Sequence, residues 1–414
     1  MEDPLQRRRA GGRDGQRRPP GRDAEDRGAV PMRDGAGRSR RGSRGAAADP
    51  GPDRLPRPSV RRLFIDTVTH GFVGYLVGRA AFERAAGKRA LAAATFGGLL
   101  PDADHLYELG GTASYILAHR GWTHGLLAVA GWGLAAAWIF GRGRPRERAL
   151  VGLAGASGLL AHTLTDLLNA FGAMPLAPFS GRRFALDWVY IIDPVLFGLL
   201  LATIGATWIR RPQAAAIARL GLGLAILYVG LCGVHHAVAL DRVRALAGER
   251  LGAARLRTVA AFPMYPTAFH WRGLIDGGDE VHEVRLRLAG GDPEWLEPWP
   301  AARLVDSRVP RTREKEAFDR LARFPAAFVR EGPDGTAAIR FSDRQFQHVP
   351  GRSIYELTMV LDRDGRVLSQ TFSDAHVAAR LALFVLIYLL AVLAARRWLR
   401  EEDRAAGDCQ TPGG

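Results

Sequence analysis

The sequence predicts a mainly helical protein, a polytopic membrane helical bundle with a small β-rich extramembrane domain. Three observations predict this class. Five long apolar stretches approach the roughly 20 residues that a helix needs to span a bilayer. Arginines gather at the ends of these stretches, where the anchors of membrane proteins lie. A later segment, 237–377, has short alternating apolar runs separated by turn residues, which is typical of strands.

The charge and the cysteines exclude two classes of function. The chain has 414 residues and a formal net charge of +15, and its 57 basic residues are almost all arginine. Such a charge is common in nucleic-acid-binding proteins. Beyond the first 60 residues, however, the arginines flank apolar stretches, so no nucleic-acid partner is expected. Cys232 and Cys409 form neither a CxxC pair nor a disulfide framework, so cysteine chemistry is not expected to carry the function.

Residues 1–60 are rich in Arg, Gly, Pro and Asp and show no apolar periodicity, so they are predicted to be disordered. Two interpretations of this tail stay open. It is either a basic cytoplasmic arm or an over-extended start, with the working protein beginning near Val60. The over-extended start is favoured, because the orientation predicted from the basic loops would place this arm on the outer side of the membrane.

A helical membrane domain is predicted for 61–236, followed at 378–398 by a C-terminal transmembrane helix and at 399–414 by a tail. The expected spans are 123–140, 149–169, 188–208, 217–236 and 379–395. Two shorter apolar segments, 67–82 and 90–100, are expected to form a helical hairpin packed against the others.

Basic loops set the predicted orientation of these helices. The arginine-rich positions 142–148, 210–211 and 396–397 are expected to face the cytoplasm. The segment 237–377 then lies on the outer side of the membrane. Runs such as VHEVRLRLAG and IYELTMVLD predict a β-rich domain there, with one amphipathic helix near 311–323.

Five short motifs place polar side chains near the ends of the apolar stretches. They are DTVTHG at 66–71, LLPDADHL at 99–106, HRGWTHG at 119–125, AHTLTDLLNAFG at 161–172 and RRFALDWVYIIDPV at 182–195. Polar side chains at membrane depth are costly and usually mark a functional site. In the predicted topology the four histidine-bearing motifs all reach the outer rim of the bundle.

The spacing within two motifs suggests how they act. His162 and Asp166 are four residues apart in a helical stretch, so their side chains share one face and can bind one ion. A hydrogen-bonded polar pair that holds two helices together is the alternative. His119 and His124 are five residues apart, a spacing that spans a turn, and Arg120 between them could pair with a carboxylate or a phosphate.

The remaining ligand candidates are weaker when taken singly. Asp102 and Asp104 follow a helix-breaking proline, and a solvated loop would explain them as well. His70 alone is more often a satisfied polar residue than a ligand. Together, imidazoles and carboxylates without thiolates suit a divalent metal ion. We therefore predict a divalent metal site, with zinc as the first choice and manganese as the alternative.

The five motifs, in this order, resemble the bacterial inner-membrane family of metal-dependent hydrolases called the YdjM/YbcI group. The likeness is dense over 65–210 and looser beyond. It implies a multi-pass hydrolase of the bacterial inner membrane, with the β-rich domain in the periplasm. More distantly, the motif order is similar to that of zinc-dependent phospholipases C. The metal ligands implied by this likeness are His70, Asp102, His124, His162 and Asp166.

The sequence departs from the phospholipase pattern at one point. No H-x-x-x-E/D motif follows Asp166, so one or two ions are expected rather than three. His119 joins the candidate metal ligands as an alternate ligand. Asp104 and His105 are candidates for supporting or alternate-ligand roles.

The predicted function is hydrolysis of an ester or phosphoester at the membrane surface by metal-activated water. Asp104 is predicted to take the proton as general base. Arg120, or Arg182 with Arg183, is predicted to hold an anionic group. A site at the membrane rim favours an amphiphilic substrate such as a phospholipid or a lipid-linked phosphate. The alternative is a non-enzymatic membrane scaffold or metal-binding protein whose β-rich domain binds a partner.

Overall fold

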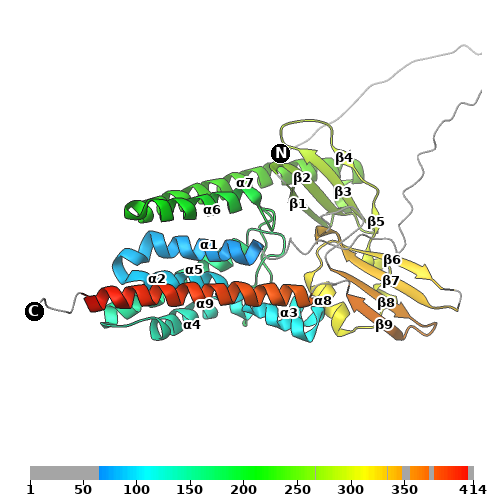
Figure 1. Ribbon diagram of the computed structural model, residues 1–414. Coiled ribbons are helices and arrows are strands. Elements are labelled where there is room, and N and C mark those ends of the chain that lie inside the picture. Colours follow the sequence, from blue (N-terminus) through cyan, green and yellow to red (C-terminus); the bar gives the residue numbers. More distant parts are fainter. Residues whose placement is uncertain (1–64, 266, 333, 347–354, 373–376, 409–414) are drawn as a thin grey trace, which may run out of the picture. The chain divides into compact units, whose positions relative to one another are not determined.

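The computed structural model describes residues 65–265, 267–332, 334–346, 355–372 and 377–408. The predictions for 1–60 and for the end of the C-terminal tail lie outside these residues. Everything described belongs to one unit, Pro56–Gly414. It is mainly helical, with a β-rich region toward the C-terminus, as the sequence predicts (Figure 1).

The helices follow the predicted apolar segments closely. Those in the described part of the chain are α1 (Ile65–Val77), α2 (Glu83–Leu99), α3 (Thr112–Ala118), α4 (Leu126–Ile139), α5 (Pro145–Asp166), α6 (Pro194–Ile209), α7 (Ala214–Leu251), α8 (Arg313–Leu321) and α9 (Val377–Asp408). The predicted hairpin at 67–82 and 90–100 corresponds to α1 and α2. A π-helical turn, Gly78–Phe82, joins them.

Three predicted boundaries are wrong. The C-terminal helix, expected to end at 398, continues to Asp408, so the first part of the predicted tail is helical. The segment expected to span from 188 becomes helical only at Pro194, because Asp193 caps α6 by accepting hydrogen bonds from the first backbone N–H groups. At the other end, α7 continues to Leu251, so the first part of the predicted β-rich segment is helical. Buried Ala239, Val243 and Ala247 recur every fourth residue there and extend the helix across the face of a sheet.

Within the described residues, two helical segments are long and apolar enough to cross a bilayer by length and composition, Arg211–Leu251 and Leu381–Arg400. Leu126–Ile139 and Pro194–Ile209 are apolar but shorter. The predicted spans that correspond to these shorter helices lose their first residues to loops, because HRGWTHG and RRFALDWVYIID do not continue the helices. Multiple passes through the membrane therefore stay a prediction.

Helices α1, α2 and α5 pack with backbone against backbone. A Cβ atom on Gly98 would lie 2.5 Å from the carbonyl oxygen of His70, and one on Gly158 would lie 2.0 Å from that of Ala94. A Cβ on Gly74 would meet the same Ala94 oxygen at 2.6 Å. Small residues at helix interfaces allow this close approach. It brings the functional side chains of α1 and α5 to one place.

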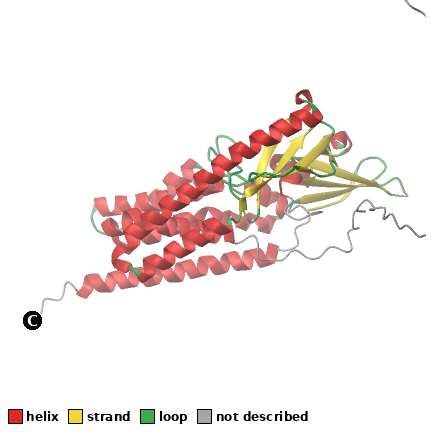
Figure 2. Ribbon diagram, turned by 90° about the horizontal axis from the view of Figure 1, so that it is seen from above, coloured by secondary structure: helices red, strands yellow, loops and turns green. Residues whose placement is uncertain are grey.

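The other helices surround this triplet. α4 packs against α5, α6 packs against α7 and α1, and α9 packs against α2. The hydroxyl of Tyr388 on α9 donates a hydrogen bond to the backbone carbonyl of Leu99 at the end of α2. Figure 2 shows the helices running side by side, with the strands gathered toward one end.

The β-rich region contains two antiparallel sheets. The first has the order β1-β2-β3-β4, with β5 also pairing with β3, and the second has the order β6-β7-β8-β9. The strands are β1 (Thr258–Met264), β2 (Thr267–Asp276), β3 (Glu280–Arg287), β4 (Glu294–Trp295), β5 (Trp299–Pro300), β6 (Pro325–Glu331), β7 (Ala337–Asp343), β8 (Glu356–Leu361) and β9 (Val367–Phe372).

Each sheet is covered by a helix. α7 lies on the first sheet, where Val243 occupies the space that a side chain at Gly273 would need. α8 lies on the second sheet, with Phe318 packed against Phe341 at a ring separation of 5.7 Å. α8 is the amphipathic helix predicted near 311–323.

Candidate metal centre

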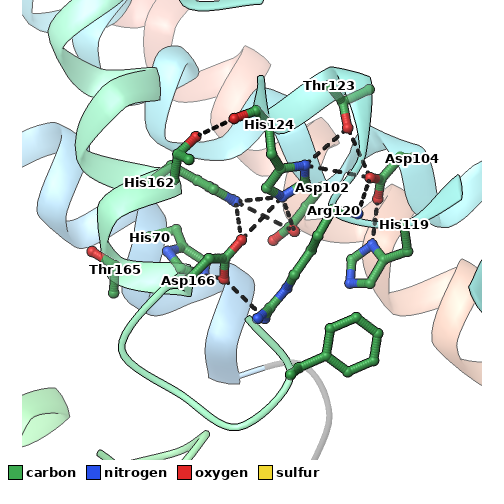
Figure 3. A network of polar contacts seen from close by, with 12 residues as sticks. His70, Asp102, Asp104, His119, Arg120, Thr123, His124, His162, Thr165 and Asp166 are labelled. Atoms are coloured by element: carbon green, nitrogen blue, oxygen red, sulfur yellow. Dashed lines mark hydrogen bonds and ion pairs between the residues drawn. The ribbon is translucent and has the colours of Figure 1, made fainter. Parts of the chain in front are cut away.

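The four histidine-bearing motifs meet around one buried cluster (Figure 3). Five of the six predicted ligands come together in it. They are His70 from α1, His162 and Asp166 from α5, Asp102 from the 3₁₀-helical segment Leu100–Gly110, and His124 from the turn Trp122–His124. All five side chains are buried. The sixth, His119, lies beside this set.

Nitrogen and oxygen atoms face each other closely at the middle of the cluster. The Nε2 atoms of His124 and His162 are 3.0 Å apart. Asp166 Oδ2 lies 3.1 Å from the first and 3.3 Å from the second. Asp102 Oδ1 lies 3.6 Å from His162 Nε2, and His70 Nε2 lies 3.2 Å from Asp166 Oδ1. At these separations the imidazole nitrogens and the carboxylate oxygens interact directly with one another.

The hydrogen bonds of the Nδ1 atoms of His124 and His162 determine whether each Nε2 atom carries a proton or a lone pair. His162 Nδ1 lies 2.7 Å from the carbonyl oxygen of Gly98, which only accepts, so Nδ1 carries the proton. Thr123 Oγ1 donates to Asp104 and so accepts from His124 Nδ1 at 2.9 Å. In the neutral rings, both Nε2 atoms therefore present lone pairs toward the Asp166 carboxylate.

This arrangement fits a cation. Neither ring nitrogen of His70 and neither oxygen of Asp166 makes a hydrogen bond of good geometry within the described residues, although both side chains are fully buried. Buried polar groups normally have partners, and a divalent ion with imidazole and carboxylate ligands would satisfy them. Three overlapping triplets have ligand atoms within 4.8 Å of one another: His70–His162–Asp166, Asp102–His124–His162 and Asp102–His105–His119.

Asp104 organises the HRGWTHG turn and is not a free carboxylate. Its Oδ1 accepts from His119 Nδ1 at 2.6 Å, and its Oδ2 accepts from the Arg120 backbone N–H at 3.0 Å and from Thr123 Oγ1 at 2.8 Å. The prediction of a general base required an unengaged carboxylate, and this geometry favours a positioning role instead. Burial lowers the pKa of His119 to about 4, since Asp104 only partly offsets the loss of hydration, so this ring is neutral at pH 7.

Arg120 was predicted to hold an anionic substrate, and the structure gives it carboxylate partners within the protein. Its Nη2 lies 2.7 Å from Asp66 Oδ2 and 2.9 Å from Asp166 Oδ1, and its Nη1 donates to Asn169 at 2.9 Å. The residue has a φ of 59°, a left-handed conformation that is costly for a side chain of this size. The turn therefore holds the guanidinium against the cluster, where it fixes the position of Asp166.

The fifth motif, 182–195, contributes little to the cluster. Arg183 reaches its edge, where Nη2 donates to the His119 carbonyl at 3.1 Å. Asp187 instead pairs with Arg323 at 2.8 and 2.9 Å, and Asp193 serves as the cap of α6. These two aspartates act in folding, which the sequence order alone did not show.

Two residues near the site, Thr67 and Glu108, escaped sequence reasoning. Thr67, three positions before His70 on α1, donates to Asp102 Oδ2 at 2.7 Å. His105 Nδ1 lies 2.8 Å from Glu108 Oε1. Burial would lower the pKa of His105, but the hydrogen bond with Glu108 and the nearby aspartates raise it. The same negative surroundings favour a bound cation. The i, i+3 spacing of His105 and Glu108 could have indicated their contact, whereas no local pattern links Thr67 to Asp102.

Fold and site together define a helical membrane-associated protein with a buried histidine and aspartate cluster that could hold a metal ion. Residues 65–239 match the family model of the YdjM inner membrane protein. This part of the chain is therefore similar to the YdjM inner membrane protein family, the family that its motifs predict.

Other comparisons are narrower. A protein of Bacillus subtilis (strain 168) named Uncharacterized protein YfhP is 31% identical over 152 residues, which cover 35% of this chain and 46% of that protein. The chain thus spans about half the length of the curated relative it matches. No solved structure matches the chain. The distant similarity to zinc-dependent phospholipases C stays a prediction.

Proposed function

We propose that this protein is a membrane-bound, metal-dependent hydrolase that cleaves an ester or phosphoester of an amphiphilic substrate. The observation that carries the proposal is the convergence of lone pairs from His124 and His162 on the buried carboxylate of Asp166. Such a set of acceptors is costly to bury without a cation between them. When bound, a divalent ion supplies Lewis acidity for a water and for the scissile group.

The residues around the ion would divide the remaining work. His70, Asp102, His124, His162 and Asp166 would hold it. Hydrogen bonds to Gly98 and Thr123 orient two of the rings, and such supporting contacts are needed for tight metal binding.

Proton transfer is better assigned to Asp66 than to Asp104. Asp66 Oδ1 lies 3.4 Å from His70 Nε2, and its side chain is 16% exposed, whereas both oxygens of Asp104 are buried and hydrogen-bonded. A base must reach a water that enters the site. Asp66 Oδ1 is therefore the atom that we expect to receive the proton.

Exposed apolar side chains near the cluster support an amphiphilic substrate. Trp122 is 57% exposed, Leu109 74% and Phe179 82%. Trp122 Nε1 also donates to the hydroxyl of Tyr107 at 3.3 Å. Aromatic side chains with a polar tip are common at membrane interfaces. We further propose that the chain crosses the inner membrane several times, with this rim and the β-rich region on the periplasmic side.

The test uses the full-length protein purified in detergent. We expect stoichiometric zinc or manganese by elemental analysis, and turnover of a phosphodiester or lipid ester that depends on it. His162→Ala and Asp166→Ala should lose metal and activity together. His282→Ala, a change in the β-rich region with no metal-site contact, should keep both. Absence of metal from the wild-type protein would overturn the proposal, and metal without turnover would favour the metal-binding scaffold.

A further inference from the structure

A second set of possible ligands lies beside the first and shares one member with it. Ligand atoms of Asp102, His105 and His119 are within 4.8 Å of one another, and all three residues are buried. The ring centroids of His105 and His119 are 4.9 Å apart. Tyr115 stacks on both rings, at 5.1 and 4.3 Å, and so restricts their rotation.

Each of the two rings is oriented by a carboxylate. His105 Nδ1 lies 2.8 Å from Glu108, and His119 Nδ1 lies 2.6 Å from Asp104. A carboxylate accepts the Nδ1 proton, so each neutral ring directs the lone pair of Nε2 the other way. Both of these hydrogen bonds are made through Nδ1. A carboxylate behind a histidine in this manner is the usual support of a metal ligand.

The charge of the cluster also exceeds what one guanidinium can balance. Four buried carboxylates lie together with one buried arginine, Arg120. They belong to Asp102, Asp104, Glu108 and Asp166. With neutral histidines the formal charge of these five groups is 1 − 4 = −3. Buried charges are stabilised only when they are paired or bind metal ions. One divalent ion would leave this set negative, whereas two would bring it to 4 − 3 = +1.

We propose that the cluster binds two cations, with Asp102 as the carboxylate between them. The first cation would lie between His124, His162 and Asp166, toward which Asp102 Oδ1 is directed. The second would be held by Nε2 of His105 and of His119. Thr67 donates to Asp102 Oδ2 at 2.7 Å and fixes the plane of the shared carboxylate.

This inference rests on the proposed function and narrows its substrate class. Paired metal ions suit in-line displacement at phosphorus, because they can stabilise both the attacking and the leaving oxygen. The substrate class is therefore a phosphoester rather than a carboxylic ester. A phosphoester in a membrane lipid and a soluble phosphodiester share this chemistry.

The experiment counts metal ions on the full-length protein in detergent. Chelator-stripped protein is dialysed against Mn²⁺ or Zn²⁺, and the bound metal per chain is measured. We expect two equivalents for the wild type and for His282→Ala, and one equivalent for His105→Ala. Paramagnetic resonance of the Mn²⁺ form should show a coupled pair in the wild type and an isolated ion in His105→Ala.

Glu108→Gln keeps all of the proposed metal ligands. It tests the second site even if His105→Ala fails to fold. It should weaken binding of the second equivalent by about 10–100-fold, the usual effect of removing a carboxylate behind a metal ligand. One equivalent in the wild type, unchanged in His105→Ala and lost in His162→Ala, would overturn the second site and leave the proposed function standing. A wild type without any metal would overturn both. Faster turnover of soluble phosphodiesters than of phospholipid vesicles would identify the soluble source.

Discussion

Substituting Gly158 by alanine tests whether backbone contact between α2 and α5 holds the metal centre together. The added Cβ would lie 2.0 Å from the carbonyl oxygen of Ala94, and real Cβ contacts are essentially never shorter than 3.0 Å. The two helices must therefore separate by at least 3.0 − 2.0 = 1.0 Å. His162 lies one turn further along α5, so its 2.7 Å contact with Gly98 would lengthen to about 3.7 Å, beyond hydrogen-bonding distance.

The cost of Gly158→Ala can be estimated from these contacts. Overpacking of a close interface costs about 1–3 kcal/mol, and leaving a buried polar group unsatisfied costs about 1–3 kcal/mol more. Alanine in place of a helical glycine returns about 0.5–1 kcal/mol. We therefore expect a net loss of about 1–5 kcal/mol in the free energy of unfolding, together with weaker metal binding.

The matched control is Gly198→Ala on α6, where an added Cβ meets no atom within 4 Å. This variant should unfold at the wild-type temperature or slightly above it. Thermal unfolding followed by circular dichroism, and metal content per chain, are measured on both variants in the same detergent. If Gly158→Ala matched Gly198→Ala in both measurements, the close packing of α5 against α2 would be refuted.

Three further predictions concern other contacts. Asp104→Asn should weaken metal binding by about 10–100-fold, measured by competition with a chelating dye, because the residue orients two ligand histidines; unchanged affinity would remove it from the site. Arg323→Ala leaves Asp187 buried without its partner, so it should cost about 1–3 kcal/mol of stability and speed proteolysis of the β-rich region. Burial would raise the pKa of Asp276, but hydrogen bonds from Arg303 and a backbone N–H outweigh it and lower the pKa below 3.8. The stability that this lowered pKa contributes is present above pH 3.8 and is lost as the pH falls further, so thermal unfolding of Asp276→Asn should depend less on pH there than that of the wild type.

The sequence predicted the helices well because their apolar runs are long and end in clear signals. Arginines and a proline mark the start of α5, and the FGG glycines mark the end of α2. Two of the wrong boundaries have one cause, since local composition competes with tertiary packing. The start of α6 is set by the cap at Asp193, and the end of α7 is set by the sheet beneath it.

The metal centre was predictable as a set of residue types and less predictable as a set of roles. The i, i+4 spacing of His162 and Asp166 predicted directly that the two side chains lie on one helix face and can bind the same ion. The role of Asp104 depended on which donors fold around it, and three of them come from a turn at 119–123. A pattern of single letters does not show that a carboxylate is already engaged. Arg120 was expected to pair with a carboxylate or a phosphate, and only the structure shows that its partners are Asp66 and Asp166.

The part that the sequence could not predict is how the β-rich region relates to the site. Phe171 is the second-last residue of the fourth motif, and its ring lies under the guanidinium of Arg120 at 5.0 Å. Its ring also contacts Phe346 at 5.8 Å and Tyr355 at 6.2 Å, both from the β-rich region. These residues are separated by more than 170 positions, and no local pattern links them. The contact places an aromatic wall from the β-rich region behind the arginine that fixes Asp166, so we expect changes in that wall to alter metal affinity without touching a ligand.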